Sequence, residues 1–219
     1  MYKIPDDNTP PYWIRPQQIL SGKKGAHRFI WDLHYNPLPV TPGFAIAATY
    51  MNTAPNASSP WVMPGKYLVT LTGTLADIGL SYTDTIEIRM DPRVKTSNAD
   101  LIKLQDATTL AYRGRINCVE YQKLVHAYRA QLQSQLTNAS ITVANRLGPF
   151  EKEAGQLENT ATGKTDPSFG RLANLFAGIF NLLEDCDNPP TSQVSAALTD
   201  ALQQLETLKK QWDVLKNKL

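Results

Sequence analysis

Three histidines and two cysteines are the residues of this sequence that could bind a transition metal or act as a catalytic base or nucleophile. His27 and His34 lie seven residues apart in an extended run, and side-chain alternation along a strand places such a pair on opposite faces. His126 is isolated in a helical segment, with no HExxH motif and no Cys/His ligand spacing around it. We therefore predict no metal site.

Motifs for nucleophilic, phosphate-binding or glycosidic chemistry are not indicated either. No serine lies in a GxSxG turn, and Cys118 lies on an apolar helical face, where burial raises the pKa of a thiol. The run 163–165 (GKT) is similar to the end of a phosphate loop, but Glu158 stands where the first glycine is needed. Asp32 and Asp91 could serve as a carboxylate pair for glycoside hydrolysis only if the fold brought them together. We assign no catalytic residue and expect no cofactor.

Aromatic residues in the first part of the chain are the remaining candidates for binding. Trp13, Tyr50 and Trp61 fall in Pro-rich irregular segments, with Asn52 close to Tyr50. Flat rings cover much apolar area at little entropic cost, so these side chains could form a carbohydrate platform or a docking surface, or fill a small core. We name Trp13, Tyr50, Asn52 and Trp61 as candidate binding residues.

Length and composition are those of a globular protein. The 219 residues are 42% hydrophobic and 19% charged, with a formal net charge of +2, which predicts neither disorder nor a field that attracts nucleic acid. The longest apolar stretches fall short of the ~20 residues of a membrane-spanning helix, so we expect no membrane insertion. No signal-peptide pattern is visible at the start.

The pattern of the chain changes at Pro92. Eleven of the 15 prolines lie at or before this residue. The same part of the chain has short β-type runs at 27–35, 66–72 and 83–90, and in the last two apolar residues alternate with polar ones. Such runs predict strands with one buried and one solvated face. We expect an α+β, multi-domain fold in which an N-terminal extension (1–16) precedes an Ig-like or fibronectin III-like β-sandwich (17–92).

After Pro92 the apolar period lengthens from two to about 3.6 residues. Capping residues and apolar positions predict helices over about 97–135, 141–157, 167–183 and 191–219, with a bend or a new start at Pro149 in the second and Pro167 in the first turn of the third. The last helix has a regular seam of apolar residues that could serve an intermolecular coiled coil, but three other amphipathic helices need a partner. We therefore expect a C-terminal antiparallel helical bundle (93–219).

Several ordered motifs together resemble a known family. They are YWIRP (12–16), GAHRFIWDLHY (25–35), PWVMPGKYLVTLT (60–72), MDPRVKTS (90–97) and DNPPTSQV (187–194). This order resembles the C-terminal region of the large bacterial sortilin-like proteins, also described as BNR-repeat glycosyl hydrolase-like or YVTN-type propeller proteins. The PGKY element is also similar to the Ig-like module of flagellar hook-cap proteins and to fibronectin III domains.

The resemblance implies a role without catalysis. In such proteins ligand binding is expected in an N-terminal β-propeller, whose repeats are missing here, so the chain corresponds to a non-catalytic accessory region that docks on the propeller and supports its ligand or glycan binding. Parents of this kind are commonly exported to the periplasm, cell surface or medium, where a Cys118–Cys186 disulfide between the first and third helices becomes plausible. The alternative is a carbohydrate-binding module that uses the loop aromatics.

Overall fold

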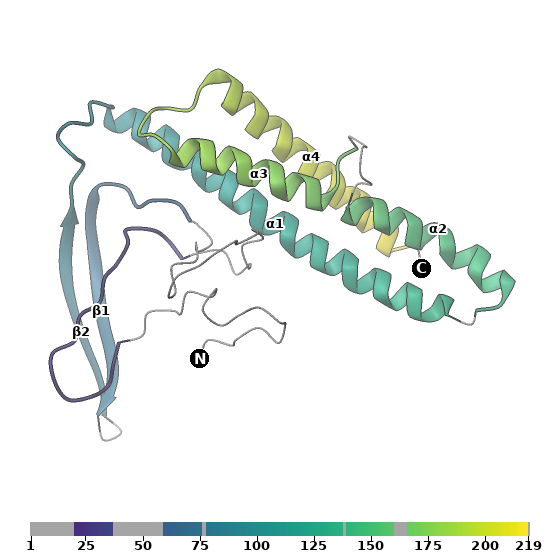
Figure 1. The fold of residues 1–219 in the computed structure, drawn as a ribbon, viewed down its shortest axis with the longest axis horizontal. Helices are drawn as coiled ribbons and strands as arrows, with labels where there is room; N and C mark the ends of the chain where they lie inside the picture. The colour runs from purple at the N-terminus through teal and green to yellow at the C-terminus, as the bar shows by residue number, and fades with distance from the viewer. Residues whose placement is uncertain (1–19, 37–58, 76–77, 138, 160–165, 219) are drawn as a thin grey trace, which may run out of the picture. The chain divides into compact units, whose positions relative to one another are not determined.

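The computed structural model describes residues 20–36, 59–75, 78–137, 139–159 and 166–218. In this part of the chain two strands precede four helices (Figure 1). They are β1 (Gly65–Leu75), β2 (Ile78–Ile88), α1 (Asn98–Leu136), α2 (Ile141–Glu158), α3 (Phe169–Glu184) and α4 (Ser192–Lys216). The chain divides into two compact units, Met1–Val62 and Met63–Leu219, so the hairpin groups with the helices and not with the residues before it.

The expected β-sandwich is wrong. In the described residues the only sheet has two strands, β1 and β2, paired antiparallel from Gly65↔Ile88 to Leu75↔Ile78. The run 27–35 forms no strand and pairs only through a single bridge between His34 and Trp61. Alternation predicted the two long strands because it is a local property, but it does not say which further strands they pair with. Each strand is also longer than the run expected for it, and two residues, 76 and 77, separate the end of β1 from the start of β2.

Each helix begins at a hydroxyl side chain that accepts a hydrogen bond from the backbone N–H three residues later, which satisfies a donor with no partner inside the helix. The caps are Ser97, Ser140, Ser168 and Thr191. The first and last caps and the extents of α1 and α4 confirm the predicted helices. α3 begins one residue after Ser168, so Pro167 precedes the cap and does not lie in the first turn, as the sequence had predicted.

α2 runs without interruption through Pro149, so the predicted new start does not occur. Proline cannot donate to the Asn145 carbonyl, and its ring normally clashes with the Cβ of the residue before it. That residue is Gly148, which has no Cβ and open space around it. The glycine therefore removes the clash with a preceding Cβ, whereas the hydrogen bond to the Asn145 carbonyl is still lost.

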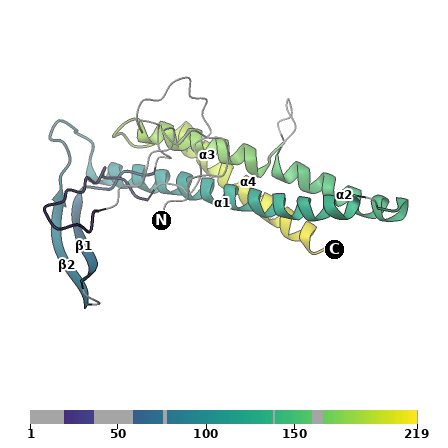
Figure 2. The ribbon, with the colours of Figure 1, turned by 60° about the horizontal axis from the view of Figure 1, so that its bottom comes forward.

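The helices form an elongated bundle in which α2 and α3 lie end to end along α1 (Figure 1, Figure 2). α3 runs antiparallel to the first half of α1, because Tyr112 contacts Phe180 while Tyr121 stacks on Phe169. α4 returns along α1 and α3 toward α2. The helical C-terminal part therefore agrees with the expected bundle. Within this bundle α2 and α3, placed end to end, share one position beside α1.

The core of the bundle lies mainly between α1, α3 and α4, and Ala154 and Leu157 of α2 extend it. The seam predicted for α4 is buried at Leu198, Ala201, Leu205, Leu208, Trp212 and Leu215. On α1, Gly114 lets the Phe176 ring approach so closely that a Cβ at this position would lie 2.6 Å from it. Among the described helices, none is both long and apolar enough to cross a bilayer.

Candidate functional site

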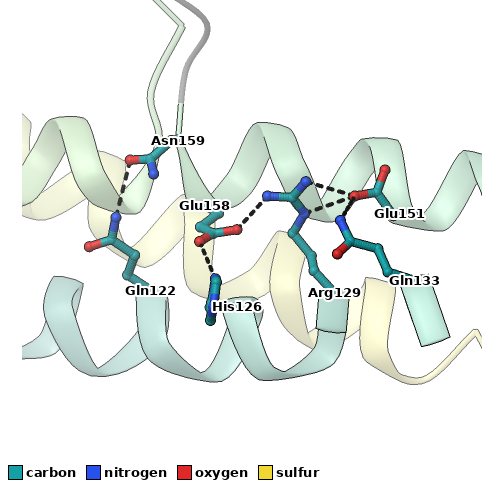
Figure 3. Close-up of polar contacts among 7 residues, drawn as sticks. All are labelled: Gln122, His126, Arg129, Gln133, Glu151, Glu158 and Asn159. Carbon is teal, nitrogen blue, oxygen red and sulfur yellow. Dashed lines mark hydrogen bonds and ion pairs between the residues drawn. The ribbon is translucent and has the colours of Figure 1, made fainter. Parts of the chain in front are cut away.

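A cluster of polar side chains joins α1 to α2 (Figure 3). Four come from α1 at spacings of three or four residues, which places them along one side of the helix, and three come from the end of α2 and its cap. They are Gln122, His126, Arg129 and Gln133 on α1, and Glu151, Glu158 and Asn159 opposite them. We call these seven residues the α1–α2 polar cluster.

Arg129 is the centre of this cluster. Its Nε and Nη2 donate to Oε1 of Glu151 at 3.1 and 2.7 Å, and its Nη1 donates to Oε2 of Glu158 at 2.6 Å. Nδ1 of His126 lies 2.9 Å from the other oxygen of Glu158. The Glu158 side chain is only 9% exposed, whereas the His126 ring is 74% exposed. The guanidinium has room here because Gly155 faces it: a Cβ at Gly155 would lie 3.3 Å from its central carbon.

Both carboxylates of the cluster are held in the charged form. Burial acts to raise the pKa of Glu158, but hydrogen bonds from Arg129 and His126 outweigh it and the pKa lies below its ordinary value. Hydrogen bonds from Arg129 and Gln133 lower the pKa of Glu151 in the same way. The cluster therefore contains two ionised carboxylates that share one guanidinium.

The chemistry of the cluster is that of a structural ion-pair network. A histidine oriented by a carboxylate acts as a catalytic base only beside a nucleophile or a substrate site. In the described residues His126 is hydrogen-bonded to Glu158 alone, and Glu158 is already paired with Arg129. The arrangement fixes α2 against α1, and we assign it no catalytic role.

The carboxylates considered from the sequence are each engaged locally. Oδ1 of Asp32 accepts from the backbone N–H of His34 at 3.2 Å, and Asp91 pairs with Arg93 at 2.6 Å. A side-chain hydrogen bond from Arg93 lowers the pKa of Asp91. Throughout the described ranges, no group of three or more His, Cys, Asp or Glu residues could hold a metal ion.

Of the four candidate binding residues, Trp61 is described, whereas Trp13, Tyr50 and Asn52 lie outside the described residues. The Trp61 side chain is 46% exposed, and its ring lies 3.7 Å from the His34 ring, centroid to centroid. Backbone hydrogen bonds from Tyr35 to Pro60 and from Val62 to Leu33 hold the two short segments together. The Trp61 ring is therefore partly exposed and is held in place by the two short segments that carry it and His34.

The two cysteines are far apart in this fold. Cys118 is buried in the middle of α1, where burial raises the pKa of its thiol to about 12, and Cys186 is exposed just after α3. The Thr96 hydroxyl donates to the Asp187 carbonyl, which places Cys186 beside the start of α1. Cys118 lies about 20 residues further along that helix, or ~30 Å at 1.5 Å per residue. A disulfide needs Cα atoms within about 7 Å, so the structure does not bring this pair together, and both thiols are free.

The hairpin presents a second kind of surface. Residues directly opposite in the register point to the same face, and one face gathers Tyr67, Val69, Leu71, Ile78, Leu80, Tyr82, Ile86 and Ile88, with Asp84 as its one charged residue. We call this set the apolar hairpin face. Threonine holds half of the positions on the opposite face, and the hydroxyl groups of Thr70 and Thr83 lie 3.2 Å apart.

The apolar hairpin face is open to solvent. Leu71 and Tyr82, which lie opposite each other at its centre, are 54% and 66% exposed. Alternation predicted the apolar positions of β1 and, in the expected run 83–90, those of Ile86 and Ile88, whereas Ile78, Leu80 and Tyr82 lie outside that run. The face was expected to be buried in a sandwich. Exposed and contiguous apolar surface of this kind is typical of a site of association. The sequence did not indicate the exposure, because alternation alone does not say what covers a face.

Comparisons with known protein families, with curated proteins and with solved structures find no match to this chain.

Proposed function

We propose that the chain is a non-catalytic interaction region that docks through the apolar hairpin face on a β-propeller domain of a larger exported protein, and so supports ligand or glycan binding by that propeller. The observation that carries this proposal is the exposure of the apolar hairpin face. The resemblance of the sequence motifs to the tails of sortilin-like propeller proteins supports the choice of partner and the exported location.

The physics of a two-stranded sheet supports an association function. An isolated hairpin is marginally stable in water and becomes stable when a further strand or a packed layer covers its apolar face. A sheet surface of a partner is a suitable cover, because sheets pack face to face through apolar side chains about 10 Å apart. Burying the Leu71 and Tyr82 side chains at the centre of the face would supply much of the binding free energy.

The two faces of β1 offer a matched pair of variants. Leu71 lies on the apolar hairpin face and Leu68, which is 75% exposed, lies on the threonine-rich face. Leu→Thr removes apolar area at either position and introduces a β-branched residue, which is favourable in a strand. The partner for the test is any propeller-containing polypeptide that the same reading frame encodes upstream of Met1.

Isothermal titration of that partner tests the proposal. We expect Leu71→Thr to weaken binding about tenfold, which corresponds to the ~1.4 kcal/mol of a partly lost leucine contact, and Leu68→Thr to change it less than twofold. Equal effects of the two variants would refute docking by this face. An upstream frame without propeller repeats would refute the choice of partner.

A carbohydrate-binding module is the second candidate, favoured by the half-exposed ring of Trp61. A sugar ring would stack on this indole, as apolar sugar faces do on flat aromatic surfaces. Titrating the chain with a panel of oligosaccharides while following tryptophan fluorescence tests this candidate, with Trp61→Ala as the variant that should abolish the response. A flat response from the wild-type chain leaves docking as the function.

A further inference from the structure

The outer edge of β1 is a surface apart from the apolar hairpin face. In the described part of the chain β1 pairs with β2 alone. The hydroxyl groups of Thr70 and Thr83 lie opposite each other and only 3.2 Å apart, as in a closely spaced pair of residues that exchange no backbone hydrogen bonds. Alternate residues of β1, counted from Thr70, therefore direct their backbone N–H and C=O groups toward the outer edge. They are Lys66, Leu68, Thr70, Thr72 and Thr74.

This edge lacks the features that keep sheet edges from pairing with other chains. Natural edges are protected by charged side chains, prolines, bulges or short length. From residue 67 to residue 75 (YLVTLTGTL) β1 has no charged residue and no proline, and its 11 residues pair with β2 without a bulge. The Leu68 side chain is 75% exposed. A regular and uncharged edge of this length is a template for a further strand.

The charges of the hairpin indicate which strand the edge accepts. β2 contains Asp84 and Glu87 and no cation, so pairing two β2 edges would gather two carboxylates from each copy. β1 contains Lys66 as its one charged residue. When two copies of β1 pair antiparallel about a two-fold axis at Thr70, the midpoint of the strand, Lys66 lies opposite Thr74 of the second copy. No like charges then face each other.

We propose that two copies of the chain associate by pairing their β1 strands antiparallel about Thr70, so that two hairpins form one four-stranded sheet. The outward backbone groups of 66–74 would make about ten hydrogen bonds between the copies. Val69 would lie opposite Leu71 of the second copy in the closely spaced kind of pair. Tyr67 would lie opposite Gly73, which has open space where a side chain would be.

The association is closed and does not depend on the proposed docking. A two-fold pair ends at two copies, whereas pairing of β1 with β2 of the next copy would continue without end. The pairing uses an edge and would extend the apolar hairpin face over four strands, and three or more strands are what such a sheet needs for stability of its own. One strand pair buries less than the ~1,600 Å² of a standard interface, so we expect a reversible dimer with a Kd of about 10–100 µM.

Sedimentation equilibrium of the full 219-residue chain tests the proposal, over roughly 1–300 µM so as to span the expected Kd. A reductant is present because the Cys186 thiol is exposed. Thr70→Pro removes an outward N–H at the centre of the edge and should weaken the dimer about tenfold or more. The matched control is Thr83→Pro, which makes the same change directly opposite, on the outer edge of β2, and should change the Kd less than about twofold.

Two further variants keep the backbone unrestricted. Thr70→Lys places the substituted side chains of the two copies opposite each other, so their repulsion should weaken the dimer, and added salt should relieve the effect. Thr74→Glu tests the register, because each new carboxylate would face Lys66 of the other copy. Two such pairs should tighten the dimer about two- to tenfold at low salt.

The outcomes that would overturn the proposal are distinct. A chain that stays monomeric throughout the concentration range has no such edge contact. A dimer that persists in Thr70→Pro and Thr70→Lys, or that Thr83→Pro weakens as much as Thr70→Pro does, is not formed through β1. Species larger than a dimer would indicate open pairing of β1 with β2, and a Thr74→Glu dimer no tighter than the wild type would refute the register centred on Thr70.

Discussion

Replacing Arg129 by methionine removes the centre of the α1–α2 polar cluster and keeps much of its aliphatic stem. In the wild type this guanidinium makes three hydrogen bonds to Glu151 and Glu158. The substitution leaves the Glu158 carboxylate, 9% exposed, with His126 as its described partner. An ionised group that loses its partner in such a place keeps the cost of desolvation without the compensating attraction.

The size of the effect follows from the exposure of the three groups. Breaking a fully buried ion pair by removing one partner costs about 3–5 kcal/mol. Arg129 is 28% exposed and Glu151 is 23% exposed, so water already screens part of the interaction. We therefore expect Arg129→Met to lower the free energy of unfolding by about 2–3 kcal/mol at neutral pH.

The effect depends on pH in a predictable direction. The pKa values of Glu151 and Glu158 lie below the ordinary value of 4.5 in the folded protein. A carboxyl group with a lowered folded pKa stabilises the fold above its unfolded pKa, and that contribution is lost as the pH falls through the folded pKa. As the pH is lowered from about 4.5, the free energy of unfolding of the wild type should thus decrease more steeply than that of Arg129→Met.

Urea unfolding followed by circular dichroism at 222 nm, between pH 3 and pH 7, measures both effects, because the signal reports the helices that the cluster joins. The control is Arg113→Met, which makes the same change at an exposed position of α1. If the two variants unfold within about 0.5 kcal/mol of each other at neutral pH, the range of ordinary surface substitutions, the assigned role of the cluster is refuted.

Three further predictions concern the helical core. Thr108→Val should raise the free energy of unfolding by about 1 kcal/mol, because the buried hydroxyl has no hydrogen-bond partner in the described residues; a decrease in urea unfolding would contradict this. Gly114→Ala should lower the melting temperature, because its Cβ would lie 2.6 Å from a phenylalanine ring of α3, whereas Gly178→Ala, with open space around it, should raise it slightly; the opposite order would show that the core is not packed in this way. In the folded, unreduced protein one thiol, that of Cys186, should react with an alkylating reagent while buried Cys118 does not, and both should react in denaturant; mass spectrometry that finds fewer than two alkylated thiols in denaturant would contradict the free state of the pair.

Local sequence signals predicted the helical part well. A polar capping residue before an apolar period of 3.6 predicted a helix start at 97 or 98 and another at 191 or 192, and the structure has the caps at Ser97 and Thr191. The seam of α4 was recognised because its buried positions recur at three- and four-residue steps. Pro149 was misjudged, since its effect depends on the glycine before it and on the packing of the whole helix.

The features that depend on distant residues were not predictable in this way. Arg129 and Glu158 are 29 residues apart in the chain, and nothing in either local pattern indicates that α2 folds back so as to bring them together. The hairpin shows the same limit, because alternation predicted the apolar positions of β1 and of the end of β2, but neither the rest of the face nor what covers it. The candidate site residues Trp13, Tyr50 and Asn52 lie outside the described residues, so their grouping with Trp61 stays a prediction.

Methyl cross-saturation NMR tests the central claim, docking through the apolar hairpin face, most directly. The chain would be deuterated and labelled at its Leu, Ile and Val methyl groups, and the unlabelled propeller partner would be saturated in the complex. We expect attenuation of the methyl signals of Leu71, Leu80 and Ile86 on the apolar hairpin face, and none at Leu68 on the opposite face. Attenuation at Leu68 but not at Leu71, or attenuation confined to methyl groups of the helices, would contradict it.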